Sequence, residues 1–319
     1  MRKKDAASEG RSGRSDQAGQ PVHSWGLHIV VCVKPVPDPA RWEKLRLDPE
    51  TLLLNRAEVP AVINPLDLNA IEQAVAIKET LGGAATISVL TMAPPDAEEQ
   101  LREALAMGCD RAYLASDRAF AGADSLATAK CLAAAIRKIG SETGLAAAGA
   151  GCGGVDLVFC GAYSADGSTA QVGPQIAELL EIPDLTHAVK LELVGGGAGR
   201  ASALRAACKV EEGTLVAECD LPALVTFGRE ANQPRLPAMH GIRRARELPV
   251  VTWSAADLGL GPESVGLKGS PTQMLNVYQQ AQGRKGEILS GRAAEMADTL
   301  VEKLVAEKAL DGADMKHRD

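Results

Sequence analysis

Short apolar runs alternate with longer segments of helical periodicity through the first half of the chain. Residues 27–33, 85–92 and 155–160 are β-branched or aromatic runs of strand length. The segments that follow 64–67 and 124 repeat apolar residues at helical spacing. Strands that alternate with helices of this length predict βαβ units, so we expect an α/β fold with a mostly parallel, doubly wound sheet.

The pattern changes in the second half of the chain. Residues 187–194 and 202–211 predict two strands, and Gly195–Gly197 between them predicts a β-hairpin. Residues 223–227 predict a further buried strand, whereas residues 229–249 show no clear periodicity. We therefore expect a hairpin added to the parallel sheet and then an irregular segment.

The C-terminal part has little periodicity from Trp253 to Arg292 and then an amphipathic helix at about 293–310. A segment of this length is too long for a simple loop inside a compact domain, so we expect an extended arm that wraps around a partner. The predicted organisation is a disordered leader at 1–25, an α/β nucleotide-binding domain at 26–252, and the partner-wrapping arm with its C-terminal helix at 253–319.

Composition and charge exclude several classes of protein. The 319 residues are 46% hydrophobic and 24% charged, which is typical of a globular protein. The net charge of −7 argues against a nucleic-acid surface. No apolar run approaches the roughly 20 residues of a transmembrane helix, and the leader lacks the apolar core of a secretory signal.

Cysteines and histidines carry no metal or disulfide pattern. The seven cysteines include no C-x-x-C pair, which indicates reduced thiols and a cytoplasmic location. The five histidines form no H-x-x-x-H cluster, so we expect no metal site.

The segment Gly161–Leu180 is the strongest candidate for a ligand site. It follows the predicted strand 155–160 and is rich in small residues and hydroxyls before it becomes helical. Small residues let a ligand approach the backbone, and amides at a helix N-terminus suit an anion, so this loop predicts diphosphate binding. The alternative is an ordinary helix entry capped by Ser168 or Thr169, because the spacing matches neither a P-loop nor G-x-G-x-x-G.

Two further features bear on this loop. Pro174 would disturb a helix that began at Ser168 but would suit the first helical position after a Gly173 cap. Doubly wound sheets bind ligands beyond the carboxyl ends of their strands. The loops after the three apolar strands can therefore converge on one crevice, which favours the nucleotide interpretation.

Five motifs in order resemble the beta subunit of electron transfer flavoprotein, from Ile29 to about Leu304. They are Val31–Asp38 (VCVKPVPD), Asn64–Asp67 with Ala70–Ala74, Ala104–Ala112 (ALAMGCDRA), Asp166–Pro174 (DGSTAQVGP) and Asn232–Arg235 (NQPR). The resemblance implies a Rossmann-like fold of the adenine-nucleotide alpha-hydrolase type. It also implies a heterodimer with an alpha subunit that holds the redox-active FAD and takes electrons from NADH or from flavin dehydrogenases such as acyl-CoA dehydrogenases.

The family's beta subunit binds a second nucleotide, which the resemblance assigns to matching positions here. Those cofactor-binding positions are Cys32, Asn64, Pro65, Leu66, Asp67, Met92, Asp166, Gly167, Ser168, Thr169, Ala170, Gln171, Val172, Gly173, Pro174 and Gln175. The same resemblance places Met239 where the family has an apolar anchor that docks into a partner dehydrogenase. A methionine that covers local core is the alternative.

Two branches of the family differ in the second nucleotide. Simple carriers keep a structural AMP, whereas the electron-bifurcating branch binds a second FAD and couples NADH oxidation to reduction of ferredoxin or flavodoxin. This chain lacks the additional acidic residue and the Asn-Gln-Thr-Gly run of AMP carriers, and Gly266–Thr272 is similar to the bifurcating branch. It departs from that branch at Ser168 and in an Ala/Gly-rich insert at 140–154. FAD is therefore favoured, and AMP remains the alternative.

Other functional classes find less support in the sequence. No side chain stands out as an acid, base or nucleophile, so we expect no catalytic residues and assign the chemistry to the flavin. An ATP-hydrolysing or adenylating enzyme needs a phosphate-gripping lysine or a Ser-Gly-Gly-x-Asp-Ser type of loop, and neither is present. A nucleotide-binding module that acts alone is a second alternative, although the long C-terminal arm argues against it.

Overall fold

The computed structural model divides into two units that are described separately, residues 1–275 and residues 276–319. The residues it describes are 26–44, 46–47, 54–55, 59–142, 152–195, 201–272, 286–307 and 309. The predicted leader and most of the Ala/Gly-rich insert lie outside these ranges.

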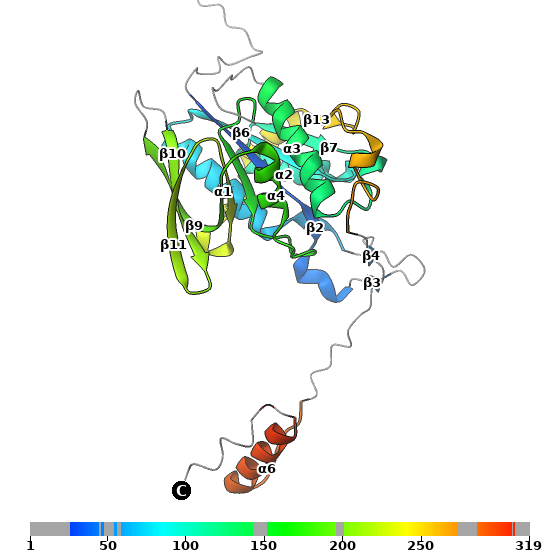
Figure 1. Ribbon diagram of the computed structural model, residues 1–319, viewed down its shortest axis with the longest axis vertical. Coiled ribbons are helices and arrows are strands. Elements are labelled where there is room, and N and C mark those ends of the chain that lie inside the picture. The colour runs from blue at the N-terminus through cyan, green and yellow to red at the C-terminus, as the bar shows by residue number, and fades with distance from the viewer. Residues whose placement is uncertain are drawn as a thin grey trace, which may run out of the picture. The chain divides into compact units, whose positions relative to one another are not determined.

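The described part of the first unit is built on a nine-stranded sheet in the order β11-β10-β9-β12-β8-β1-β6-β7-β13. Figure 1 shows β9, β10 and β11 of this sheet in yellow-green. Neighbours from β13 to β9 pair in parallel, whereas β9, β10 and β11 pair antiparallel. The strands are β1 (Leu27–Cys32), β6 (Ala85–Met92), β7 (Arg111–Ala115), β8 (Leu157–Gly161), β9 (Asp184–Gly195), β10 (Ala201–Val210), β11 (Gly213–Asp220), β12 (Ala223–Phe227) and β13 (Val250–Trp253).

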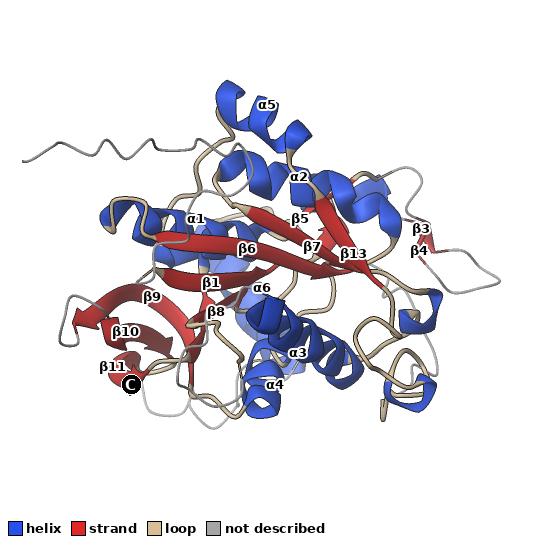
Figure 2. Ribbon diagram, turned by 90° about the horizontal axis from the view of Figure 1, so that it is seen from above, coloured by secondary structure: helices blue, strands red, loops and turns tan. Residues whose placement is uncertain are grey.

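Helices cover both faces of the sheet, as Figure 2 shows. Alternate residues along a strand point to opposite faces. Val31 therefore packs in the core beneath α1, α2 and α5, whereas Val30 packs beneath α3 and α4. This arrangement confirms the predicted doubly wound α/β fold. The helices are α1 (Pro65–Thr80), α2 (Glu98–Met107), α3 (Ser125–Glu142), α4 (Val172–Leu180) and α5 (Met239–Glu247), with α6 (Ala293–Ala306) in the second unit.

Smaller elements complete the first unit. Short antiparallel pairs form between β2 (Pro35–Pro37) and β5 (Ala61–Ile63), and between β3 (Arg46–Leu47) and β4 (Leu54–Asn55). Short 3-10 segments lie at Pro39–Lys44, Pro95–Ala97, Arg118–Phe120, Arg229–Ala231 and Pro262–Ser264. None of the described helices combines the length and the apolar character that a membrane crossing requires.

The start of α1 follows from its sequence. Asn64 is the N-cap, Pro65 takes the first helical position, and Asp67 places an acidic group in the first turn. The helix ends at Thr80, and Gly82 and Gly83 then adopt positive φ. The start of α1 thus positions Asn64 and Asp67, which organise the candidate site.

One prediction about secondary structure was wrong, and one was incomplete. Residues 229–249 are not irregular throughout, because they contain α5, and β13 follows directly. The predicted hairpin is confirmed by β9 and β10, and β11 adds a third antiparallel strand that was not predicted. Most residues of β11 are exposed, so its sequence shows no pattern of residues that pack into the core.

The helix α4 begins at Val172, between the two predicted starts. Pro174 therefore lies in the first turn, where its missing N–H removes no intrahelical hydrogen bond.

The segment after β13 packs against the sheet unit before the second unit begins. Trp253 is buried and stacks on Tyr113 with ring centroids 4.9 Å apart. Ala255 and Val265 are buried as well. The structural division falls after Leu275. The wrapping of a partner by the rest of the arm stays a prediction, and α6 starts at the predicted Ala293.

Candidate functional site

A cavity of about 720 Å³ opens at the carboxyl ends of the central parallel strands. Residues that end β1, β6 and β8 line it, together with the loop before α4 and the start of α3. The three loops that the sequence placed beside one crevice therefore do meet there. Of the predicted binding residues, the cavity is lined by Cys32, Asp67, Met92, Asp166, Gly167, Thr169, Ala170, Gln171, Val172 and Gly173.

The remaining predicted residues are not part of the cavity lining. Pro65 and Leu66 form the first turn of α1, and Pro174 and Gln175 lie within α4. Ser168 is in the loop itself, where its amide donates to the Ser164 carbonyl at 2.9 Å. Asn64 is buried behind the cavity wall. The predicted set therefore combines residues that line the cavity with residues that support it.

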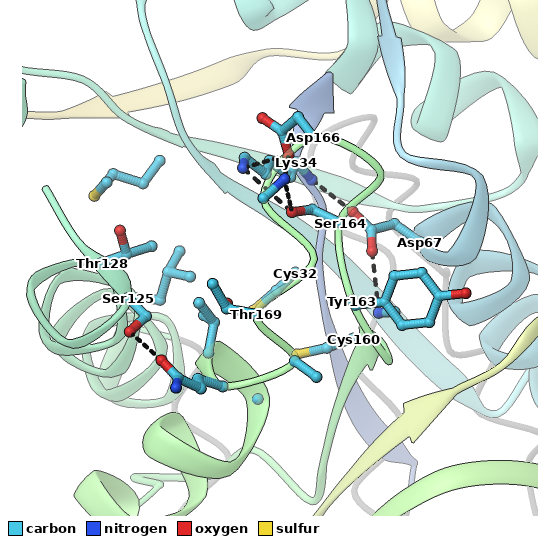
Figure 3. Close-up of a pocket in the computed structure, with 18 of the residues that line it drawn as sticks. Cys32, Lys34, Asp67, Ser125, Thr128, Cys160, Tyr163, Ser164, Asp166 and Thr169 are labelled. Carbon is cyan, nitrogen blue, oxygen red and sulfur yellow. Dashed lines mark hydrogen bonds and ion pairs between the residues drawn. The ribbon is translucent and has the colours of Figure 1, made fainter. Parts of the chain in front are cut away.

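Asp67 joins three segments of the site beneath the cavity (Figure 3). Its carboxylate accepts hydrogen bonds from the Lys34 amide at 2.7 Å, the Asn64 side chain at 2.9 Å and the Gly161 amide at 3.0 Å. Burial raises the pKa of Asp67 to about 7, although these donors and the Lys34 charge oppose the rise. The sequence assigned Asp67 only to the helix start, whereas the structure makes it the link between β1, β8 and α1.

Asn64 extends this support to the loop that follows β8. Its side-chain amide donates to the Tyr163 carbonyl at 3.0 Å, and its oxygen accepts from the Ala165 amide at 3.0 Å. Asn64 thus satisfies backbone groups that would otherwise be buried without a partner. The Asn-Pro-x-Asp start of α1 consequently holds both the strand end and the loop.

Lys34 and Asp166 form an ion pair at the cavity wall (Figure 3). The Nζ of Lys34 lies 2.7 Å from Asp166 Oδ1 and 3.3 Å from Ser164 Oγ. Burial alone would raise the pKa of Asp166, but hydrogen bonds from Lys34, Ser164 and the Gly167 amide outweigh it and lower that pKa. Lys34 was missed as a site residue, although it directly follows a strand that points at the crevice.

The loop before α4 combines strained backbone conformations with backbone amides that have no hydrogen-bond acceptor in the described part of the chain. Ser168 and Ala170 have φ of 51° and 55°, in the left-handed region that non-glycine residues rarely adopt. Within the described part of the chain, the amides of Thr169, Ala170 and Gln171 donate to no protein acceptor. Such amides at a helix entry form a concave surface for an anion.

The glycines of this region differ in how closely they are packed. A Cβ on Gly161 would lie 2.3 Å from Asp67 Oδ1, and one on Gly173 would lie 2.7 Å from Thr226 Cγ2. A Cβ on Gly167 would meet nothing closer than Ser164 Oγ at 3.4 Å. Close packing thus requires glycine at 161 and 173, whereas Gly167 leaves space beside the cavity.

The opposite wall comes from the start of α3, which the sequence analysis missed as part of the site. Ser125 and Thr128 line the cavity, and Ser125 Oγ donates to Gln171 Oε1 at 2.8 Å. Asp124 caps α3 through the Ala127 amide and accepts from the Thr272 amide at 3.0 Å. A signal was present in the sequence, because Asp124 and Ser125 follow β7 in the chain and so reach the same edge of the sheet.

The donors and the apolar floor of this cavity fit an anionic nucleotide. Free loop amides, the α4 entry, Lys34 and the Ser125, Thr128 and Thr169 hydroxyls offer partners for phosphate and ribose oxygens. Cys32, Met92 and Leu132 provide an apolar surface for a ring system. The fold and this cavity define an α/β protein of the nucleotide-binding class.

Comparison with known proteins narrows this class to one family. A family model described as the electron transfer flavoprotein domain matches residues 51–258. The chain belongs to the electron transfer flavoprotein family, and its similarity to beta subunits extends over most of its length. It is an electron-transfer subunit.

Three relatives illustrate this similarity. An electron transfer flavoprotein subunit beta of Thermoanaerobacterium thermosaccharolyticum is 43% identical over 87% of this chain and 98% of its own length. The caffeyl-CoA reductase-Etf complex subunit CarD of Acetobacterium woodii is 41% identical, with the same coverages. Protein FixA of Bradyrhizobium diazoefficiens is 42% identical over 87% of this chain and 91% of its own.

Proposed function

We propose that this beta subunit pairs with an alpha subunit that holds a redox-active FAD, and that its own cavity binds a second nucleotide. The observation that carries the proposal is the cavity at the carboxyl edge of the sheet, with its free loop amides beside Lys34. The Thr169–Gln171 amides would face the phosphates. Lys34 would leave its ion pair with Asp166 and bind a phosphate oxygen instead. The apolar floor would contact the ring system.

We favour FAD over AMP as the second nucleotide. FAD is much larger than AMP, and a volume of about 720 Å³ lies in the upper part of the usual range for ligand pockets. The part of the chain similar to the bifurcating branch, Gly266–Thr272, reaches this site because Thr272 lines the cavity. A flavin here would supply one- and two-electron chemistry, while the chain would supply binding and orientation.

The favoured physiological role is transfer of electrons from NADH or a flavin dehydrogenase, with bifurcation toward ferredoxin or flavodoxin. The name of the CarD relative, a subunit of a reductase-Etf complex, supports association with a CoA-ester oxidoreductase of the acyl-CoA dehydrogenase kind. We place the protein in the cytoplasm, because all seven cysteines are free thiols, as a reducing compartment favours.

The proposed docking anchor is Met239, the first residue of α5. Its side chain is 82% exposed, and Leu236 nearby is 88% exposed. Exposed apolar side chains that gather on one surface are typical of protein contact sites, and these two residues are three positions apart in sequence. The Met239→Ala variant should slow reduction by a partner dehydrogenase without a change in flavin content. Equal rates for the variant and the wild type would remove the docking role.

The nucleotide content of the complex tests the main proposal. We would co-express the chain with its alpha subunit, denature the purified complex and identify the released nucleotides by chromatography and absorbance. Two FAD per heterodimer would support the second flavin site and call for a test of NADH oxidation. One FAD with one AMP would assign the chain to the simple carriers. A complex that released only the alpha subunit's FAD would contradict the cavity assignment.

A matched pair of glycine variants locates the second nucleotide. Gly167→Leu adds a side chain beside the cavity without a backbone clash, so it should reduce the second nucleotide and leave the alpha subunit's FAD. Gly261→Leu is the control, because a Cβ there meets open space and Gly261 does not line the cavity. If Gly167→Leu retained the full nucleotide content, the loop would not be the binding site.

A further inference from the structure

Two cysteines lie side by side where β1 and β8 end. These strands pair in parallel with Val31 opposite Phe159, so the next residues, Cys32 and Cys160, lie at the same level of the sheet. Cys32 also pairs with Leu90 on β6, and Cys160 pairs with Thr226 on β12. Both thiols point to the face covered by α3 and α4, since both belong to the hydrophobic core on that side.

Both side chains are part of the cavity surface. Each is 7% exposed and lines the cavity, and Figure 3 shows both at its edge. A hydrogen bond to Cys32 raises the pKa of the Cys160 thiol well above its usual value, with burial and the nearby Asp67 acting in the same direction. The other five cysteines are outside the cavity lining. The cavity therefore carries a dithiol from neighbouring strands.

We propose that Cys32 and Cys160 form a dithiol site that binds a trivalent organoarsenical or a similar thiophile through the cavity, and that a bound nucleotide excludes it. Neighbouring strands are about 4.8 Å apart, which falls within the range of Cα separations that two bridged cysteines adopt. The dithiol site stands on the sheet register and the cavity alone. The exclusion by nucleotide rests on the proposed function.

The binding step needs no oxidant or reductant. A trivalent arsine oxide condenses with two thiols, so that two S–H bonds break and two As–S bonds form. The arsenic oxygen leaves as water with both protons. Arsenic stays trivalent, and each sulfur keeps its oxidation state.

Phenylarsine oxide is the probe for this site. The full chain in its complex, stripped of the second nucleotide, is treated with phenylarsine oxide and analysed by intact mass and by titration of thiols after denaturation. We expect a single arsenical on this chain, resistant to a monothiol and released by a dithiol. Two of the seven thiols of this chain should lose their reactivity.

Single substitutions separate the dithiol from the other cysteines. Cys32→Ser and Cys160→Ser should each abolish dithiol-sensitive binding, whereas Cys131→Ser, a buried cysteine outside the cavity, should keep it. The corresponding alanine variants serve if a serine destabilises the core, and thermal unfolding checks every variant. Binding that persists in both single variants, or its absence from the folded nucleotide-free chain, would overturn the proposal.

Protection by nucleotide distinguishes this proposal from the proposed function. Loss of arsenical binding on reloading with FAD supports both. Equal binding in loaded and stripped protein supports the dithiol site, because the thiols still react as a pair. The same result contradicts the placement of the nucleotide in this cavity.

Discussion

Two segments that follow neighbouring strands are held in opposite ways. The cavity loop, residues 162–171, follows β8, and the docking segment, residues 228–238, follows β12, which pairs with β8 in parallel. Both segments therefore leave the same edge of the sheet. The cavity loop relies on its own backbone and on supports beneath it, whereas side chains bind the docking segment to the outside of α1.

The docking segment is held by paired polar groups. Asn69 and Asn232 each donate from the side chain to the other's carbonyl, at 2.8 and 3.0 Å. The Arg235 guanidinium contacts the carboxylates of Glu72, at 2.9 Å, and Glu79, at 2.6 Å. These contacts fix the turn while Met239 beyond it stays exposed.

The cavity loop keeps unused donors and left-handed residues, and α1 supports it only at its base through Asn64 and Asp67. A partner surface can be recognised by a segment that is rigid beforehand, since preorganisation reduces the entropy lost on docking. A nucleotide site can leave amides unpaired in the free protein, because the bound ligand supplies their hydrogen-bond acceptors. The comparison thus predicts that changes in the cavity loop alter ligand content, whereas changes in the docking segment alter encounter with a partner.

Gly161→Ala should have the largest effect. The added Cβ would lie 2.3 Å from Asp67 Oδ1 and 2.9 Å from the Leu66 backbone, so the α1 start must move. We expect a loss of about 2–3 kcal/mol in the free energy of unfolding, together with loss of the second nucleotide. Denaturant unfolding and nucleotide analysis measure both. Gly261→Ala is the control, and wild-type behaviour of Gly161→Ala would contradict the support role of Asp67.

Asp67→Asn should have the next largest effect, because an amide NH₂ cannot accept from the donors around that side chain. The expected cost is about 1–3 kcal/mol near pH 5, which is typical of a buried polar group left unsatisfied. The pKa of Asp67 is raised to about 7 in the folded chain. Its contribution to stability is therefore full below its unfolded pKa and falls as the pH rises through about 7.

The cost of Asp67→Asn should accordingly shrink between pH 5 and pH 8. Unfolding free energies of wild type and variant across this window measure the trend, with the exposed Asp96→Asn as control. A cost that increased with pH would show that the folded protein holds Asp67 ionised, and would reverse the assigned sign.

Arg235→Ala should affect partner encounter and leave nucleotide content unchanged. Loss of the contacts to Glu72 and Glu79 frees the turn before Met239, so we expect the KM for a partner dehydrogenase to rise about 2–10-fold with little change in kcat. Arg235→Lys should restore the KM only in part, because lysine lacks the planar guanidinium that contacts both carboxylates. Full additivity with Met239→Ala would indicate that the clamp and the anchor act independently.

The fold could be predicted from the sequence because its central strands are fully buried and strongly apolar. β1 and β12 have uninterrupted buried patterns. β11 could not be predicted, since its side chains are mostly exposed and it pairs only along one edge. The helix α5 was missed because its arginine-rich sequence has few apolar residues, and only Gly241 and Ala245 are buried.

The position of the cavity could be predicted from the sequence, but the separate roles of its residues could not. The position of the loop after β8 follows from chain order, because parallel strands end at a common edge. The separate roles of Gly161 and Gly167 depend on Asp67, which lies 94 residues from Gly161 in sequence. The ion pair between Lys34 and Asp166 likewise joins groups 132 residues apart. Such contacts depend on tertiary packing that no local pattern reports.

Ala170→Gly should have the smallest effect and should be stabilising. Ala170 has φ of 55°, and a left-handed residue with a Cβ carries about 1–2 kcal/mol of strain that glycine avoids. Glycine also makes the unfolded chain more flexible, which offsets part of this relief. The net gain in unfolding free energy should therefore stay below about 1 kcal/mol. Ala162→Gly, in the same loop at a buried position without positive φ, is the control and should destabilise. Equal losses in both variants would show that the conformation at Ala170 stores no strain, and the contrast between an incomplete cavity loop and a rigid docking segment would then rest on hydrogen bonding alone.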